Sequence, residues 1–145
     1  MKDAARSAPV PGPVIAQAAL QIEVVRPGRI AEVAAWPGAE ADIGAAIGHA
    51  LGVAPPRRPG AVSAGGQALV MMLTRRRWMI EHQDDAMMPA DLRRAVGREA
   101  GAVFDLSAAR GVFVIDGACA VALARKLVPV DFDDPRHGPG SVVVT

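Results

Sequence analysis

The pattern of apolar and polar residues predicts a series of short strands interrupted by helices. Weak alternation over residues 21–26 predicts a strand, and the Pro-Gly turn after it predicts residues 29–36 as its hairpin partner. Residues 67–74 and 78–80 are apolar and flank three arginines, which predicts two paired strands joined by a tight basic turn. Two further strands are predicted at residues 61–63 and 141–145.

Two helices are predicted in the first two thirds of the chain. Residues 39–51 carry large apolar residues at four-residue spacing, which defines one inner face. Gly44 and Gly48 weaken this helix, which predicts that its backbone packs closely against a sheet. Pro89 is suited to the first residue of the second helix. The inner faces carry Ile43, Ile47 and Leu51 in the first helix, and Leu92 and Val96 in the second.

Residues 102–132 predict a strand, a tight turn, a second strand and a third helix. Asp105 and Ser107 can hydrogen-bond nearby backbone and so form the turn. Residues 112–115 are β-branched or aromatic throughout, which predicts a buried strand. Asp116, which ends that strand, is a candidate N-cap for the helix.

The third helix is predicted from Ala118, and Cys119 lies in its first turn on the same face as Leu123 and Leu127. A helix N-terminus can lower the pKa of a thiol and favour the reactive thiolate. Free cysteines are more often small buried apolar residues, and the two leucines favour that interpretation. We therefore expect Cys119 to be buried and to react with thiol reagents only after denaturation.

Length and order of elements predict a single α+β domain. The 145 residues are enough for one core, and the segment at 1–19 is rich in proline and alanine, which predicts a disordered or extended tail. Residues 20–145 form the domain, with halves at about 20–100 and 101–145. The first half predicts the order β-β-α-β-β-α and the second β-β-α-β.

Charge and composition exclude several classes of partner. The formal net charge of +1 provides no field that would attract nucleic acid, and the few aromatic residues provide no stacking platform for bases. No apolar run approaches the roughly 20 residues of a membrane-spanning helix. A single cysteine excludes an internal disulfide and suits a reducing cytoplasm. We expect a cytoplasmic protein that binds neither nucleic acid nor membrane.

No catalytic or cofactor-binding constellation can be assembled from the residues. Phosphate-binding loops, dinucleotide fingerprints and nucleophile elbows are absent from the sequence, so we expect no flavin or nicotinamide on this chain. Glu81, His82, Asp84 and Asp85 cluster without a recognised metal-ligand spacing, which favours a solvated acidic loop. The same holds for His137 beside two aspartates, and His49 is expected on the exposed side of its helix.

The basic turn at Arg75, Arg76 and Arg77 has two interpretations. Runs of charge are most often solvated surface, which favours a simple hairpin turn. Arginine is also enriched at protein interfaces, so contact with a partner protein is the alternative. With the adjacent Trp78, these three arginines are the candidate partner-interface residues.

Five segments in the same order resemble the sarcosine oxidase gamma subunit family of the glycine-cleavage T-protein superfamily. Their order over the last half of the chain carries more weight than any one of them. The resemblance implies ferredoxin-like halves that share an antiparallel sheet with helices packed on it. The matching segments are RRRWMI (75–80), VFDLS (103–107), VFVIDG (112–117), ARKLVPVD (124–131) and GSVVVT (140–145).

The resemblance implies a non-catalytic gamma subunit of a heterotetrameric complex with alpha, beta and delta subunits. Such complexes demethylate sarcosine oxidatively to glycine, with tetrahydrofolate as acceptor of the one-carbon unit. FAD, FMN, NAD, zinc and tetrahydrofolate are then expected on the partner subunits, and no cofactor on this chain. The family continues beyond the position of Thr145, so the second half looks truncated. We therefore expect open sheet edges, and a chain that aggregates or oligomerises when made alone.

Two other functions remain open. One is a folate-dependent enzyme of the same superfamily, either an aminomethyltransferase or an iron–sulfur repair factor. Against it, the acidic segment of the aminomethyltransferases and the Lys-Gly-Cys signature of the repair factors are both absent from this sequence. The other is a ferredoxin-like regulator that senses a small molecule, which would require a homodimer.

Overall fold

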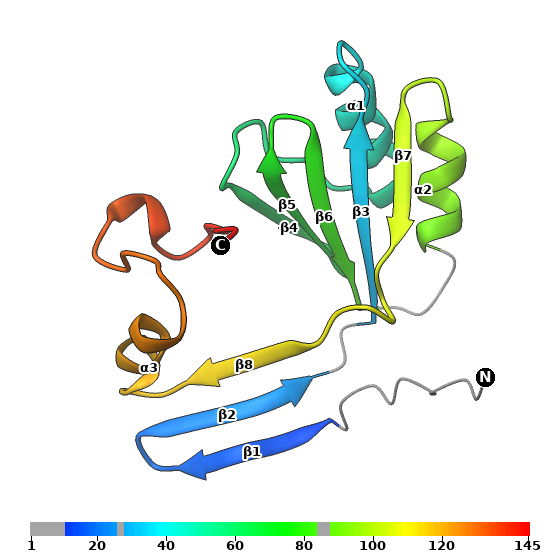
Figure 1. Ribbon diagram of the computed structural model, residues 1–145. Coiled ribbons are helices and arrows are strands. Elements are labelled where there is room, and N and C mark those ends of the chain that lie inside the picture. Colours follow the sequence, from blue (N-terminus) through cyan, green and yellow to red (C-terminus); the bar gives the residue numbers. More distant parts are fainter. Residues whose placement is uncertain (1–10, 26–27, 84–87) are drawn as a thin grey trace, which may run out of the picture.

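Two antiparallel sheets and three α-helices make up the computed structural model, which describes residues 11–25, 28–83 and 88–145 (Figure 1). The α+β prediction is confirmed. No helix among these residues is long and apolar enough to cross a membrane. The elements are β1 (Gly12–Gln17), β2 (Leu20–Val25), β3 (Arg29–Ala35), α1 (Glu40–Leu51), β4 (Val62–Gly65), β5 (Ala68–Thr74), β6 (Arg77–His82), α2 (Met88–Val96), β7 (Gly101–Asp105), β8 (Val112–Asp116), α3 (Ala120–Leu127) and a 3-10 turn (Pro135–His137).

The larger sheet has the order β4-β5-β6-β3-β7 and carries the core on one face. Alternate residues of β3, β5 and β6 point to that face, because side chains alternate across a strand. Ile43 and Ile47 of α1 and Leu92 of α2 pack on it and are fully buried, as their spacing predicts. Each such side chain contributes about 1.5–3 kcal/mol when it leaves water.

The glycines of α1 contact a loop and not the sheet. A Cβ on Gly48 would lie 3.4 Å from Pro55 Cδ, and one on Gly44 would lie 3.8 Å from Pro55 Cγ. The predicted close packing of this helix against a sheet is therefore wrong, because the glycines face the proline-rich segment 53–59 and would accept a Cβ at ordinary van der Waals distance. Proline suits this contact because its backbone φ is fixed and its nitrogen carries no N–H that would need a hydrogen-bond acceptor.

The smaller sheet has the order β1-β2-β8, and it shows that the predicted hairpin was wrong. β2 pairs with β1 and β8, whereas β3 pairs with β6 and β7. β3 is buried along most of its length and occupies an interior position of the larger sheet. β1 lies within the segment that was predicted as a tail at residues 1–19, of which residues 1–10 lie outside the described part of the chain.

The two halves share both sheets, because β7 joins the first through β3 and β8 joins the second through β2 (Figure 1). The turn predicted at Asp105 and Ser107 lies where the chain passes between the sheets. Asp105 Oδ1 accepts hydrogen bonds from the Ser107 hydroxyl at 2.6 Å and the Ser107 N–H at 3.0 Å. Ser107 Oγ accepts from Ile30 N–H at 3.0 Å, and Leu106 N–H donates to Ile30 O at 2.8 Å. The turn is thereby attached to the start of β3.

The predicted burial of residues 112–115 was wrong, although the strand is present as β8. Phe113 is 60% exposed and Val114 46% exposed. β8 is an edge strand, and its apolar run alone did not determine whether another layer would cover it.

Cys119 is exposed, which contradicts the prediction that it is buried. It is the N-cap of α3 and lies outside the helical face, and its N–H donates to Ala19 O at 2.9 Å. Asp116 does not cap the helix, since its Oδ1 accepts from the neighbouring Gly117 N–H. No residue of α3 is buried.

The final predicted strand at residues 141–145 does not form. Ser141 makes one bridge to Ala61, and Val142 N–H donates to Gly60 O at 2.8 Å. Val143 and Val144 are exposed. A β-branched run forms a regular strand only where a neighbouring strand continues beside it, and β4 begins after Ala61.

Candidate functional site

The four candidate interface residues occupy the turn between β5 and β6, where their surroundings differ sharply. Arg75 and Arg76 are exposed at the turn. Arg77, the first residue of β6, contacts Glu32 of β3, and Trp78 is only 3% exposed. The structure therefore leaves two of these side chains free to meet a partner from solvent, and contact of the set with a partner stays a prediction.

Arg77 and Glu32 form a structural ion pair. Glu32 is 8% exposed, and its Oε1 accepts from Arg77 Nε at 2.7 Å and lies 2.5 Å from Arg77 Nη2. A buried carboxylate needs such a partner, because its desolvation is costly. Arg77 thus pairs with Glu32 across neighbouring strands of the larger sheet.

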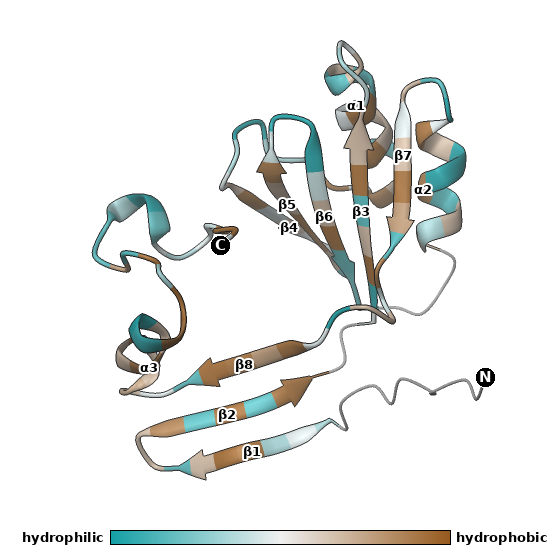
Figure 2. Ribbon diagram, in the orientation of Figure 1, coloured by the Kyte–Doolittle hydropathy of each residue, from teal (hydrophilic) through white to brown (hydrophobic). Residues whose placement is uncertain are grey.

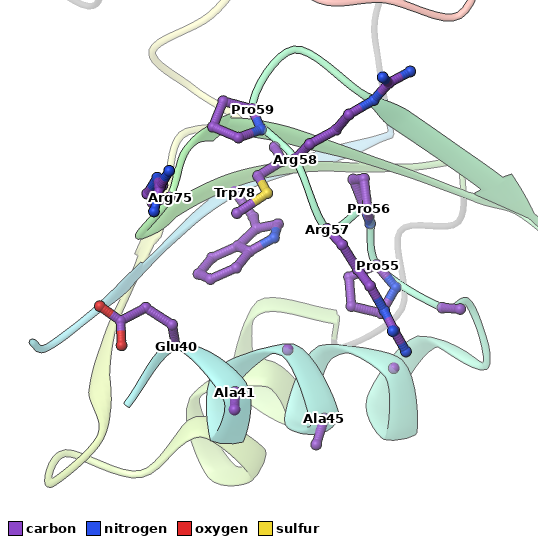
Figure 3. Close-up of a pocket in the computed structure, with 14 residues that line it drawn as sticks. Glu40, Ala41, Ala45, Pro55, Pro56, Arg57, Arg58, Pro59, Arg75 and Trp78 are labelled. Atoms are coloured by element: carbon purple, nitrogen blue, oxygen red, sulfur yellow. The ribbon is translucent and has the colours of Figure 1, made fainter. Parts of the chain in front are cut away.

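A pocket of about 920 Å³ lies between α1, the proline-rich loop and the β5–β6 turn (Figure 3). The sequence analysis named no functional residue in segment 53–60, and so missed Arg57 and Arg58. Their one signal is two adjacent arginines among three prolines. The lining residues are Glu40, Ala41, Gly44, Ala45, Gly48, Ala54, Pro55, Pro56, Arg57, Arg58, Pro59, Met72, Arg75 and Trp78.

Potential metal ligands do not come together. The described ranges, with their gaps at 26–27 and 84–87, contain no group of three or more His, Cys, Asp or Glu side chains that could hold a metal ion. Asp84 and Asp85 of the acidic cluster lie outside these ranges. His137 Nδ1 lies 2.7 Å from Asp131 O, and His49 is exposed on α1 as predicted.

Asp134 caps the short turn that carries His137. Its carboxylate accepts from the Arg136 backbone N–H at 2.9 Å and from the Arg136 guanidinium. The hydrogen bond from the Arg136 side chain is the main reason that the pKa of Asp134 is well below its usual value. These contacts are local and structural.

Exposed apolar side chains gather on β8 and α3, where Figure 2 shows β8 largely hydrophobic. We call this set the β8–α3 surface. Leu127 is 63% exposed, which is unusual for a residue on the apolar stripe of a helix. Such groups of apolar residues are characteristic of surfaces that another molecule covers. The β8–α3 surface comprises Phe113 and Val114 of β8, which as neighbours in a strand point to opposite faces of the sheet, together with Val121 and Leu127 of α3.

The chain is similar to known sarcosine oxidase gamma subunits. It is 30% identical over 102 residues to the subunit from Corynebacterium sp. strain P-1, and 31% identical over 103 residues to that from strain U-96. The subunit from Arthrobacter sp. is 30% identical over 102 residues. Each match covers 70% of this chain and 50% of the relative, so the chain spans about half the length of the curated relatives it matches. No protein-family model matches the chain.

A solved structure supports the same relationship. A chain of the heterotetrameric sarcosine oxidase from Corynebacterium sp. U-96, in complex with pyrrole 2-carboxylate, superposes with a TM-score of 0.74 at 27% sequence identity. The superposition covers 89% of this chain and 66% of that chain. Sequence and fold therefore agree over most of the described residues.

Proposed function

Because the chain belongs to the sarcosine oxidase gamma subunit family, as its motifs predicted, we propose that it is a non-catalytic subunit of a heterotetrameric sarcosine oxidase. The observation that carries the proposal is the agreement of fold with a chain of such an enzyme over 89% of this chain. The complex would oxidise sarcosine to glycine in the cytoplasm. Alpha, beta and delta subunits would be its partners.

We assign the redox chemistry to those partners. The family resemblance implies that FAD, FMN, NAD, zinc and tetrahydrofolate would bind to them, and the lack of a phosphate-binding loop and of a metal-ligand spacing in this sequence agrees with that assignment. The role of this chain is then assembly and support of the catalytic subunits.

The β8–α3 surface supports a role in assembly. Phe113 and Leu127 are more than half exposed, and burying such side chains against a partner removes apolar area from water. Aromatic residues at the centre of an interface often contribute most of the binding free energy. Phe113 is therefore the residue that we expect to contribute most.

Coexpression with the alpha, beta and delta subunits encoded in the same genome tests the proposal. We expect this chain to copurify with them in equal amounts, and the complex to consume oxygen when sarcosine is added. Omitting the chain should lower the yield of assembled complex. A chain that never joins the others, or that forms a ligand-responsive homodimer or binds folate alone, would contradict the proposal.

A matched pair of variants tests the surface. Phe113→Ser should weaken assembly by at least about tenfold, since truncating a central interface aromatic typically costs about 2 kcal/mol or more. Phe104→Ser is the control, because Phe104 is 51% exposed on β7 of the other sheet. Equal effects of the two substitutions would show that the β8–α3 surface is not the interface.

A further inference from the structure

The pocket described above has apolar walls that leave room for a flat molecule. After Glu40 at its start, the side of α1 that faces the pocket carries only alanine and glycine, so the helix contributes no large apolar side chain, although Pro55 of the loop packs against Gly44 and Gly48. Met72 and Trp78 supply the floor from the sheet, and the prolines of the 53–59 loop supply the opposite wall. A volume of about 920 Å³ lies within the range of about 300–1,000 Å³ that is typical of small-molecule sites.

Cationic side chains outnumber anionic ones around this pocket, with Arg57, Arg58 and Arg75 against Glu40. Figure 3 shows Arg57 reaching from the loop toward α1, Arg58 extending away from it, and Arg75 at the same end as Glu40. No ion pair or hydrogen bond engages the Arg57 guanidinium within the part of the chain that the structure describes. Arg57 is thus a positive charge at the pocket that no carboxylate of the described residues pairs with.

The Trp78 side chain supplies an independent sign of a missing partner. Its Nε1–H is buried and, among the described residues, has no acceptor. The other tryptophan differs, because Trp36 Nε1–H donates to Arg98 O at 2.9 Å. Buried N–H groups are nearly always hydrogen-bonded, since an unmade bond leaves the cost of desolvation uncompensated. In Figure 3 the nitrogen edge of the Trp78 ring faces the side of the pocket on which Arg57 lies.

We propose that this pocket binds an organic carboxylate with a flat apolar body. The carboxylate would occupy the end at Arg57, which is the side that the nitrogen edge of the Trp78 ring faces. The body would lie against Ala41, Ala45 and Met72. A guanidinium and an N–H donor are the groups that recognise a carboxylate, and the uncharged walls match an apolar body. The inference does not depend on the assembly of the chain with other subunits.

The full chain with Trp36→Phe provides a direct assay, because Trp78 is then its only tryptophan. We would titrate it with 1-naphthoate, with the neutral and nearly isosteric 1-naphthamide, and with inorganic phosphate. Saturable change of Trp78 fluorescence is expected with naphthoate. Naphthamide should bind at least about tenfold more weakly, since it lacks the charge-assisted bond, and phosphate should not saturate at the same concentrations. Equal affinities for naphthoate and naphthamide would overturn the proposal.

Three substitutions locate the binding. Arg57→Gln should weaken naphthoate about tenfold and leave naphthamide unchanged, whereas Arg76→Gln, an exposed arginine outside the pocket, should change neither. Ala45→Phe should abolish binding of both by filling the pocket, and Ala45 is exposed, so the fold should tolerate it. If thermal unfolding shows that the Ala45→Phe variant has lost structure, the Ala41→Phe variant is used in its place. Binding that survives both phenylalanines, or that ignores Arg57→Gln, would refute the site.

A final experiment distinguishes binding of a small molecule in the pocket from occupation of the pocket by a segment of a partner protein. The same titration is repeated on the chain after coexpression with the sarcosine oxidase subunits. Retained naphthoate binding supports the proposal. Binding to the isolated chain that disappears in the complex would show that a partner segment fills the pocket, which would refute a small-molecule site while leaving assembly intact.

Discussion

Gly101 occupies one of the most crowded backbone positions in the molecule. It is the first residue of β7 and pairs with Ala35 of β3. A Cβ at this position would lie 2.3 Å from Ala34 O and 3.0 Å from Ile43 Cδ1. The carbonyl oxygen belongs to the adjacent strand and cannot rotate away, so β7 would have to move from β3. Gly101→Ala therefore disturbs the sheet and its contact with α1 together.

The expected magnitude follows from two opposing effects. Overpacking of a filled core costs about 1–3 kcal/mol, and a forced backbone shift belongs at the upper end. Alanine also lowers the conformational entropy of the unfolded chain, which stabilises the folded state by about 0.4–1 kcal/mol. We expect the free energy of unfolding to fall by about 2 kcal/mol. Gly44→Ala is the matched control: its Cβ would meet only Pro55 Cγ at an ordinary 3.8 Å, and helix propensity favours alanine by about 1 kcal/mol.

Urea denaturation followed by circular dichroism measures both changes. For a small domain with a slope of about 2 kcal/mol per molar urea, Gly101→Ala should lower the midpoint by about 1 M. Gly44→Ala should raise it by up to about 0.5 M. The two substitutions add the same methyl group, so shifts of the same sign, or an unchanged midpoint for Gly101→Ala, would show that the close approach of β7 and β3 is not as described.

Other predictions concern single contacts. Cys119 should react with a thiol reagent in the native protein at nearly the rate seen in urea, because it is exposed. Ile47→Ala should lower the unfolding free energy by about 2–5 kcal/mol, while Leu127→Ala should change it by less than about 0.5 kcal/mol. The hydrogen bond from the Ser107 side chain is the largest cause that lowers the pKa of Asp105. A group whose pKa is lowered in the folded state stabilises the fold at pH values above its unfolded pKa of about 4. This stabilisation is lost as the pH falls through the folded pKa. Ser107→Ala should therefore reduce the difference in melting temperature between pH 6 and pH 3.

The sequence predicts elements well where one periodic face meets the core. The spacing of Ile43 and Ile47 predicts α1 and its buried side, and both side chains are fully buried. Asp105 and Ser107 predict their turn, because that chemistry is local. The hydrogen bond that the Ile30 N–H donates to Ser107 Oγ spans 77 positions, and no local pattern contains it.

The burial of apolar runs was predicted less well, because it depends on whether another strand or helix of the fold packs over the run. Residues 112–115 have the composition of an interior strand, yet β8 lies at a sheet edge. Cys119 was placed on a buried face because the helix was expected to begin before it, whereas α3 begins at Ala120 and has no buried face. The pocket was missed for a related reason, since alanine and glycine on α1 give no periodic signal.

The arrangement of strands in the two sheets has a consequence for the order of folding. The five strands of the larger sheet, with α1 and α2, all come from residues 29–105, so this unit can form from one continuous stretch of chain. β2, by contrast, must wait for β8, which lies almost a hundred positions later, and closing so long a loop is slow. During synthesis on the ribosome, the β1–β2 hairpin would emerge first, but it could pair with β8 only after the larger sheet had been synthesised. Amide hydrogen exchange should therefore be slowest in β3 and β6 and markedly faster in β2 and β8.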